Sequence, residues 1–430
     1  MTYREAVERV LGLRGGELAG MHQGLERIET LLSAIGNPEQ SFRIAQIGGT
    51  NGKGSVASIL AAILTAAGLR TGLYTSPHLL SFRERIRVNG AAIPEDDVAD
   101  GVEALATLVA RLDATMFEAA TALALDHFAR EGVEVAVLEV GMGGRLDATT
   151  VGSPAVEVLS RIDLDHERYL GPSLAAIAAD KACIIRSGVA LSARQEPEVA
   201  EILEDRARAA GVPLLAAGRA LRVSVRERSL AGQRLDLGGP GWAFTDARLG
   251  LLGVYQPENA LLAAAAGHVL GAGEAAVRVG LEAARWPGRF QVIAGSPTIV
   301  LDGAHNPAGA RALAASLTAY FPDRPITVVI GVSADKNAAG ILAPLAPLAA
   351  RFILTAARNA RAARPEVLRA ALPPGAPAVE VAVGVGEALA RARHHGDVIC
   401  VAGSLFVIGE ALGELGGGAD IPCPAPGARC

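Results

Sequence analysis

The chain has 430 residues, which is long for one hydrophobic core and predicts two or three domains. Half of the residues are hydrophobic and 20% are charged, so the composition excludes a disordered chain. The net charge of −5 gives no basic footprint for nucleic acid, and no apolar run reaches the roughly 18 residues that a membrane span needs. Four cysteines without zinc or disulfide spacing, and a charged N-terminus unlike a signal peptide, lead us to expect a cytoplasmic protein.

Short β-like runs alternate with Ala- and Leu-rich helical runs, a pattern that predicts parallel sheets covered by helices. The run at 133–140 is almost continuously apolar, as a strand buried on both faces requires. In the first part of the chain we expect strands at 42–47, 71–74, 133–140 and 155–160, and helices at 55–67 and 117–130.

The pattern changes at 221–237, where apolar and polar residues alternate and half-exposed antiparallel strands are expected. Helical sequence follows at 258–271 and 274–285, and Trp286-Pro287-Gly288 is the expected hinge between domains. Beyond the hinge the strand–helix rhythm restarts, with strands expected at 298–301, 326–330, 352–355, 378–381 and 398–401.

The predicted fold class is therefore α/β, with two domains. Residues 1–288 are expected to form a P-loop-type, mostly parallel sheet with a small β region. Residues 289–430 are expected to form a smaller, Rossmann-like α/β domain. The tail at 416–430 is rich in Gly and Pro, and we expect it to be disordered.

A glycine-rich loop, Gly49-Thr50-Asn51-Gly52-Lys53-Gly54-Ser55, joins the first strand to a helix. Glycines let backbone N–H groups approach phosphate oxygens, and the helix N-terminus adds positive potential. Lys53 is placed to reach the β- and γ-phosphates of ATP, and Ser55 to ligate Mg²⁺. The strict P-loop spacing is not met, because one residue is missing before Gly52 and Gly54 separates Lys53 from Ser55. A turn without a ligand is the alternative.

Polar residues follow two central strands where those strands end. Glu139 closes the apolar run, at the edge of the sheet where α/β proteins bind ligands, and could hold Mg²⁺ directly or through water. His166, in Asp163-Leu164-Asp165-His166, follows the strand expected at 155–160 and could ligate a metal. Each residue taken singly has an alternative. Glu139 could pair with Arg145, His166 could be an ordinary loop histidine, and Lys181 could be a solvated helix residue.

In the second domain, Asp302-Gly303-Ala304-His305-Asn306-Pro307 follows the first expected strand and opens a helix. Pro307 suits the first helical position and Asn306 suits the N-cap. Asp302 and His305 would then lie at the carboxyl end of a strand. A capping turn and a functional site are both compatible with this segment.

Taken together, these segments resemble folylpolyglutamate synthase/dihydrofolate synthase of the Mur ligase superfamily. The resemblance runs from Gly24-Leu25-Glu26-Arg27 to Gly403-Ser404-Leu405. The segments that carry it most specifically are 49–55, 74–79, 139–149, Asp165-His166 with Leu170-Gly171, 181–185, Gly288-Arg289-Phe290 and 302–307.

The resemblance implies a role for each matching residue. It implies that residues 1–288 form the ATP-binding domain and residues 289–430 the ligase domain. ATP would be bound by Thr50, Asn51, Gly52, Lys53, Gly54, Ser55, Asn259, Arg289 and Asp302. Mg²⁺, in two ions, would be held by Ser76, Glu139, His166 and a carbamylated Lys181. Catalytic roles are implied for Lys53, Lys181 and His305. The pterin pocket would include Thr115, Phe117, Glu118, Leu146, Asp147 and Ala148.

The implied activity is an ATP-dependent addition of L-glutamate to dihydropteroate, to folate polyglutamates, or to both. A substrate carboxylate would attack the γ-phosphate, and the glutamate amine would then displace phosphate from the acyl phosphate. A monomer that binds only small molecules, with no nucleic acid and no membrane, is implied as well.

Three positions depart from the family pattern: Asp180 and Cys183 beside Lys181, and Tyr255 ahead of Asn259. The first two weaken the expectation of a carbamate. A cell-wall Mur ligase is one alternative, but only about forty residues precede the loop, too few for its extra UDP-sugar domain. A non-ligating ATP-binding switch and a P-loop kinase are the others.

Overall fold

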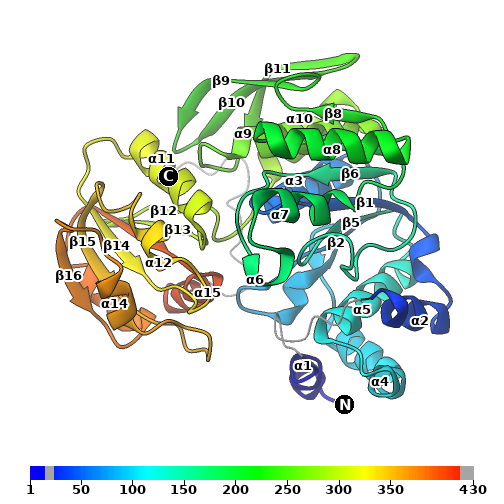
Figure 1. Cartoon of the computed structure of the whole chain (residues 1–430), viewed down its shortest axis with the longest axis horizontal. Helices are drawn as coiled ribbons and strands as arrows, with labels where there is room; N and C mark the ends of the chain where they lie inside the picture. Colours follow the sequence, from blue (N-terminus) through cyan, green and yellow to red (C-terminus); the bar gives the residue numbers. More distant parts are fainter. Residues whose placement is uncertain (15–23, 417–430) are drawn as a thin grey trace. The chain divides into compact units, whose positions relative to one another are not determined.

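The computed structural model describes residues 1–14 and 24–416. Contacts divide the chain into two compact units, Met1–Pro77 with Arg85–Trp286, and His78–Glu84 with the chain from Pro287 onward. Both units are drawn in Figure 1. The segment His78–Glu84 belongs to the second unit, where Leu79 lies against Gly288 and Gly409. The ranges 1–288 and 289–430 stay a prediction for the folding domains.

The first unit is built on an eight-stranded sheet of order β4-β3-β2-β5-β1-β6-β7-β8. From β2 to β8 every pairing is parallel, and β3 and β4 extend one edge in antiparallel fashion. The strands are β1 (Arg43–Gly48), β2 (Thr71–Tyr74), β3 (Ile86–Val88), β4 (Ala91–Ala92), β5 (Val135–Glu139), β6 (Val156–Leu159), β7 (Val189–Ser192) and β8 (Leu214–Ala216).

Helix α3 (Lys53–Ala66) is the central helix of this unit. It packs on β1, β2 and β5 with one side and on α9 (Gln256–Val269) and α10 (Glu274–Ala283) with another. Because neighbours cover it on both sides, it is apolar almost all round, unlike an amphipathic surface helix. The other helices of this unit are α1 (Tyr3–Leu11), α2 (Glu26–Ala34), a 3₁₀ turn (Pro38–Gln40), α4 (Glu95–Leu112), α5 (Met116–Arg130), α6 (Glu167–Leu170), α7 (Leu174–Ala182) and α8 (Pro197–Ala210).

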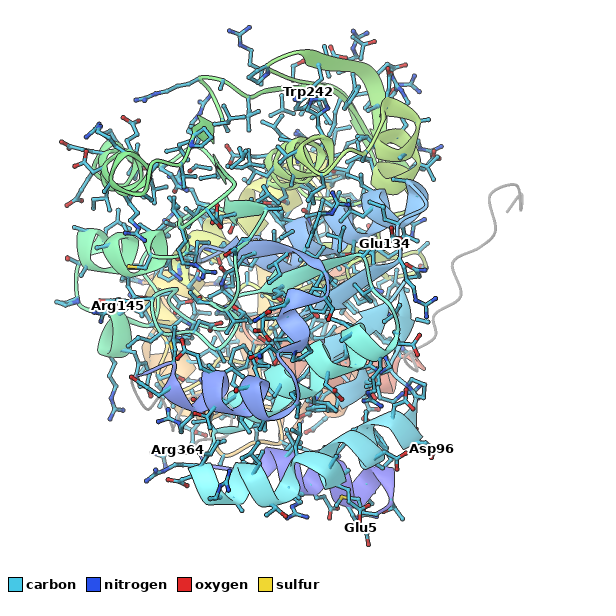
Figure 2. All side chains as sticks on the ribbon, turned by 90° about the vertical axis from the view of Figure 1, so that its right-hand side faces the viewer. Glu5, Asp96, Glu134, Arg145, Trp242 and Arg364 are labelled. Atoms are coloured by element: carbon cyan, nitrogen blue, oxygen red, sulfur yellow. The ribbon has the colours of Figure 1, made fainter. Side chains whose placement is uncertain are left out.

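A separate three-stranded antiparallel sheet of order β11-β10-β9 lies over α9 and α10. Its strands are β9 (Arg222–Ser229), β10 (Gly232–Gly239) and β11 (Trp242–Leu249). Leu235, Leu237 and Phe244 point into the same core as α3 and α9. Figure 2 shows Trp242 on this sheet, at the end of the unit away from α4. This sheet is the small β region that the sequence predicts, with a third strand added.

The second unit holds a six-stranded sheet of order β12-β13-β17-β14-β15-β16, parallel except for the β12 edge. Its strands are β12 (Gln291–Ile293), β13 (Thr298–Asp302), β14 (Ile326–Ile330), β15 (Ala349–Leu354), β16 (Ala378–Val381) and β17 (Val398–Ala402). Its helices are α11 (Pro307–Tyr320), α12 (Ala338–Leu342), α13 (Pro365–Ala370), α14 (Val385–Ala392) and α15 (Leu405–Glu414). A 3₁₀ turn, Phe82–Arg85, lies where the chain returns to the first unit.

The predicted α/β class with a mostly parallel sheet in each half is confirmed. The expected strands all exist, but the sequence analysis missed β3, β4, β7, β8, β11 and β12, which are short or lie at sheet edges. Apart from Gly416, the expected disordered tail lies outside the described residues. Within residues 1–14 and 24–416, no helix is long and apolar enough to cross a membrane.

Candidate active site

The glycine-rich loop connects the end of β1 to the start of α3. Gly52 is the N-cap of α3 with φ of +98°, and no side chain caps the helix. The first-turn N–H groups therefore lack intrahelical acceptors and carry the positive end of the helix dipole. A Cβ on Gly52 would lie 2.6 Å from Asn259 Oδ1, so glycine is also required by the close approach of α9. This arrangement suits an anion such as phosphate.

Two lysines converge on one carbonyl of this loop. Lys53 Nζ lies 3.3 Å from the Gly49 oxygen and 3.4 Å from the Thr50 oxygen. Lys181 Nζ, on α7, donates to the same Gly49 oxygen at 2.8 Å. Lys181 is only 3% exposed, and this burial, followed by the charge of Lys53, lowers its pKa to about 7. A large fraction of Lys181 is thus neutral near pH 7.

We expect Lys181→Met to stabilise the protein near neutral pH. Because the folded-state pKa lies near 7 and the unfolded one near 10.5, the parent gains stability as pH rises between them. Methionine does not titrate, so the advantage of Lys181→Met should fall by about 1.4 kcal/mol per pH unit between pH 8 and pH 10. Urea unfolding in CO₂-free buffer measures the difference in the free energy of unfolding between Lys181→Met and the parent at each pH, with Lys336→Met as control. An advantage independent of pH would contradict the assignment.

Glu139 and Ser76 meet at the ends of two neighbouring strands. Glu139 is the last residue of β5, and Ser76 follows β2, which pairs with β5 in parallel. The Ser76 backbone N–H donates to Glu139 Oε2 at 3.1 Å. Glu139 is 5% exposed, so its carboxylate is held in place rather than solvated. The structure thus brings together two of the expected magnesium ligands.

The loop after β6 lies against the glycine-rich loop. Thr50 Oγ1 donates to the Asp163 oxygen at 3.0 Å and accepts from the Asp163 N–H at 3.1 Å. His166 begins α6 in a left-handed conformation, φ +56°, with its Nε2 at 3.9 Å from Asp165 Oδ2. In the described part of the chain, no group of three His, Cys, Asp or Glu residues forms a ready metal cluster. An ion here would need oxygens from ATP or water.

Gln256 was not among the residues expected in the site. It is fully buried, and its Nε2 donates to Ser55 Oγ at 3.1 Å. Asn259 Nδ2 in turn donates to Gln256 Oε1 at 2.9 Å. Gln256 and Asn259 lie about one turn apart on α9, and together they orient the Ser55 hydroxyl. The sequence signal was the amide placed three residues before Asn259 on the same helix face.

The expected pterin-pocket residues divide into two groups. Glu118 forms a capping box with Thr115 and an ion pair with Arg27 at 3.0 Å, so its carboxylate is occupied. Asp147 is likewise occupied, because it accepts from Met142 N–H and from Thr149, and its burial raises its pKa. Both carboxylates are thus held by groups of the protein itself.

The second group is apolar. Phe117 is partly exposed and packs on Tyr74, with the ring centroids 5.8 Å apart. Leu146 is also partly exposed, whereas Ala148 is 5% exposed. Tyr74 is fully buried and bonded to Thr121, so burial raises its pKa and keeps the phenol neutral. Among the expected pocket residues, Phe117 and Leu146 are therefore the apolar ones with partly exposed side chains.

In the second unit, Asp302 ends β13 and organises the turn into α11. Its carboxylate accepts from the Phe290 and Ala304 N–H groups at 2.9 and 2.8 Å. Asn306 caps α11 through Gly309 N–H and Pro307 is its first residue, as predicted. His305 Nδ1 lies 2.8 Å from the Gly303 oxygen. A carbonyl only accepts, so Nδ1 carries the hydrogen and Nε2 is the basic nitrogen of the neutral ring.

Two known domain families match this chain. The Mur ligase middle domain matches residues 47–267, and the Mur ligase glutamate ligase domain matches residues 288–405. A dihydrofolate synthase/folylpolyglutamate synthase of Mycobacterium tuberculosis is 38% identical over 84% of this chain and 80% of its own length. The chain belongs to the folylpolyglutamate synthase/dihydrofolate synthase family of Mur ligases. The family resemblance predicted from the sequence is therefore confirmed.

Solved structures agree with this membership. A Mycobacterium tuberculosis folylpolyglutamate synthase complexed with ADP and AMPPCP superposes with a TM-score of 0.89 at 35% identity, over 96% of this chain and 99% of that one. Escherichia coli FolC in complex with DHPP and ADP gives 0.88 at 30% identity, over 97% and 98%. The chain spans only about half, 50% and 51%, of two haloarchaeal relatives named as probable bifunctional folylpolyglutamate synthase/dihydropteroate synthases.

Proposed function

We propose that this protein is an ADP-forming ligase that joins L-glutamate to dihydropteroate, to folate polyglutamates, or to both. The observation that carries the proposal is the glycine-rich loop, where Lys53 and Lys181 converge on the Gly49 carbonyl at the start of an uncapped helix. The ADP and AMPPCP complexes of the Mycobacterium tuberculosis protein support ATP as the nucleotide. The complex of the Escherichia coli protein with DHPP and ADP supports a small-molecule acceptor bound together with the nucleotide.

The chemistry proceeds in two transfers. An oxygen of the acceptor carboxylate attacks the γ-phosphorus, the bond to ADP breaks, and an acyl phosphate forms. The amine of glutamate then attacks the acyl carbon, loses its proton, and phosphate leaves. Lys53 would offset the charge of the transferring phosphoryl group, and the first-turn N–H groups of α3 would hold the phosphates.

The residues of the second unit are assigned by proposal as well. Arg289 and Asp302 would bind ATP, and His305 would act near the reacting phosphate or the incoming glutamate. Its Nε2, the basic nitrogen when Nδ1 donates to Gly303, suits the acceptance of the amine proton.

Mg²⁺ fits the residues present. Ser76 and Glu139 offer oxygen donors at adjacent strand ends, and Mg²⁺ in nucleotide sites takes one or two carboxylates plus phosphate oxygens. We assign Ser76, Glu139 and His166 as its protein ligands. When bound, the ion would neutralise charge on the phosphate oxygens. Because Glu139 is held by the Ser76 N–H, its carboxylate needs little reorganisation to serve as a ligand.

Lys181 is proposed to carry a carbamate that helps to hold a second Mg²⁺. Its neutral amine can attack CO₂, releasing a proton and leaving a carboxylate on the side chain. Burial that lowers its pKa to about 7 favours this reaction, since only the neutral amine is nucleophilic. The chain has three lysines, Lys53, Lys181 and Lys336, which makes the modification simple to locate.

We expect ¹³C-bicarbonate to give one carbamate signal in the ¹³C spectrum of the parent protein and of Lys336→Met. Lys181→Met should lack that signal, because the nitrogen that binds CO₂ is gone. Removal of bicarbonate should also lower ligation several-fold in the parent. The same set of carbamate signals in Lys181→Met as in the parent, or no such signal in the parent at saturating bicarbonate, would refute the modification.

For the pterin we propose a wall of Phe117, Leu146 and Ala148, with Thr115, Glu118 and Asp147 shaping it. We also propose a monomer, which the family resemblance implies, and a cytoplasmic location, which the cysteine spacing favours.

The test of function is coupled ADP release with dihydropteroate or tetrahydrofolate, each with and without glutamate. We expect release that depends on glutamate with at least one acceptor. Release without glutamate dependence would favour a kinase or a simple ATPase. Binding of ATP without release would favour a non-ligating switch.

A further inference from the structure

Gly54, the residue that interrupts the usual Lys-Ser pair of a P-loop, lies against the indole ring of Trp286. A Cβ built on Gly54 would be 2.5 Å from Trp286 Cζ2 and 2.8 Å from both Cε2 and Nε1. Gly54 belongs to the first turn of α3 and is not among the residues with positive φ. Its backbone would therefore accept alanine, which favours helices more than glycine does. The ring of Trp286, and not the backbone, is what excludes a side chain there.

A second contact holds Arg285, the residue before Trp286, against helix α3. Ser58 Oγ donates to the Arg285 backbone oxygen at 2.7 Å, and Ser58 lies one turn after Gly54 on α3. Arg285 and Trp286 are the last two residues of the first unit before the chain passes into the second at Pro287. The end of the first unit is thus fixed to the helix that opens with Lys53.

The indole N–H of Trp286 is a buried donor without an acceptor among the described residues. Trp286 Nε1 is buried and has no hydrogen-bond partner in the described structure. A buried donor without an acceptor costs free energy, and in folded proteins such groups mark strain or function. The unpaired indole N–H is thus a second feature of this ring, besides its contact with Gly54, that points to a functional role.

We propose that Trp286 is a positioning residue for the nucleotide. Its ring holds the turn at Gly54, and so the flanking Lys53 and Ser55, in the conformation that binds phosphate, and the ring shifts when phosphate binds. The inference rests on ATP binding by this loop, which is part of the proposed function. Trp286 acts through the loop and touches no reacting atom.

A double-mutant cycle tests the contact between Gly54 and Trp286. Gly54→Ala should raise the KM for ATP about thirtyfold and Trp286→Ala about tenfold, with the KM for glutamate unchanged. In the double variant the methyl group added at position 54 fits into the space that the indole ring has left. The KM of the double variant for ATP should therefore stay within about threefold of that of Trp286→Ala. Trp286→Phe, which keeps a ring, should restore most of the affinity. Multiplicative effects near three hundredfold would overturn the proposal.

A fluorescence titration tests the movement without disturbing the contact. The chain has two tryptophans, and Trp242 lies on the three-stranded sheet (Figure 2). Trp242→Phe leaves Trp286 as the sole tryptophan. Its emission, excited at a wavelength that tyrosine does not absorb, should shift saturably with ATP or ADP at the Kd that calorimetry gives. Trp286→Phe, which emits from Trp242, should show no such shift. Calorimetric binding with a flat Trp286 signal overturns this inference alone, whereas no binding at all overturns the proposed function with it.

Discussion

Replacing Lys53 with alanine is expected to lower glutamate-dependent ADP release by at least about a thousandfold, because charge on the transferring phosphoryl group loses its fixed cation. In the structure the Lys53 ammonium contacts loop carbonyls at 3.3 and 3.4 Å, which are long bonds that ATP phosphates can replace. The side chain is only partly buried, so the fold should survive its removal. Initial rates at saturating ATP, glutamate and acceptor measure the loss.

Lys336→Ala is the matched control, since Lys336 lies in the second unit and outside the proposed site. It should keep activity within about twofold of the parent. Circular dichroism and thermal unfolding should be alike for all three proteins. Near-normal turnover in Lys53→Ala would remove the glycine-rich loop from the mechanism.

The second large effect is expected at the end of β5. Glu139→Gln keeps the shape and the contact with the Ser76 N–H but removes the charge that would hold Mg²⁺. We expect a loss of about a hundredfold or more in kcat and a rise in the Mg²⁺ concentration needed for half-maximal rate. The measurement is a Mg²⁺ titration of ligation at fixed ATP.

The same strand offers the control. Glu134, which Figure 2 labels, precedes β5 at its opposite end, is exposed, and accepts from the Arg70 N–H at 2.8 Å. Glu134→Gln should leave the Mg²⁺ dependence of the parent unchanged. An unaltered Mg²⁺ dependence in Glu139→Gln would refute its assignment as a ligand.

The central strands were predictable because burial on both faces imposes a continuous apolar run. β5 is such a strand, and β14 is another, with every residue buried. β8 and β12 are three-residue strands at sheet edges with partly exposed side chains, so they have no comparable periodicity. The polar ends of β5 and β13 were predictable for a topological reason, because parallel strands end at one edge of a sheet.

The contacts that other segments make with the glycine-rich loop were not predictable from the sequence. The imperfect spacing at Gly54 has no local cause, and only the packing of Trp286, more than two hundred residues later in the chain, explains it. The bonds from Gln256 to Ser55 and from Lys181 to Gly49 are likewise contacts between distant segments. The sequence also did not show that the carboxylates of Glu118 and Asp147 are bonded within the protein, because a carboxylate by its residue type alone suggests contact with a ligand.

The central claim, that ATP activates the acceptor carboxylate as an acyl phosphate, is tested most directly by following oxygen. Dihydropteroate or tetrahydrofolate labelled with ¹⁸O in the acceptor carboxylate is incubated with ATP, Mg²⁺ and glutamate, and the released phosphate is analysed by mass spectrometry. The account predicts one ¹⁸O in the phosphate for each amide formed. Amide formed with unlabelled phosphate would contradict it.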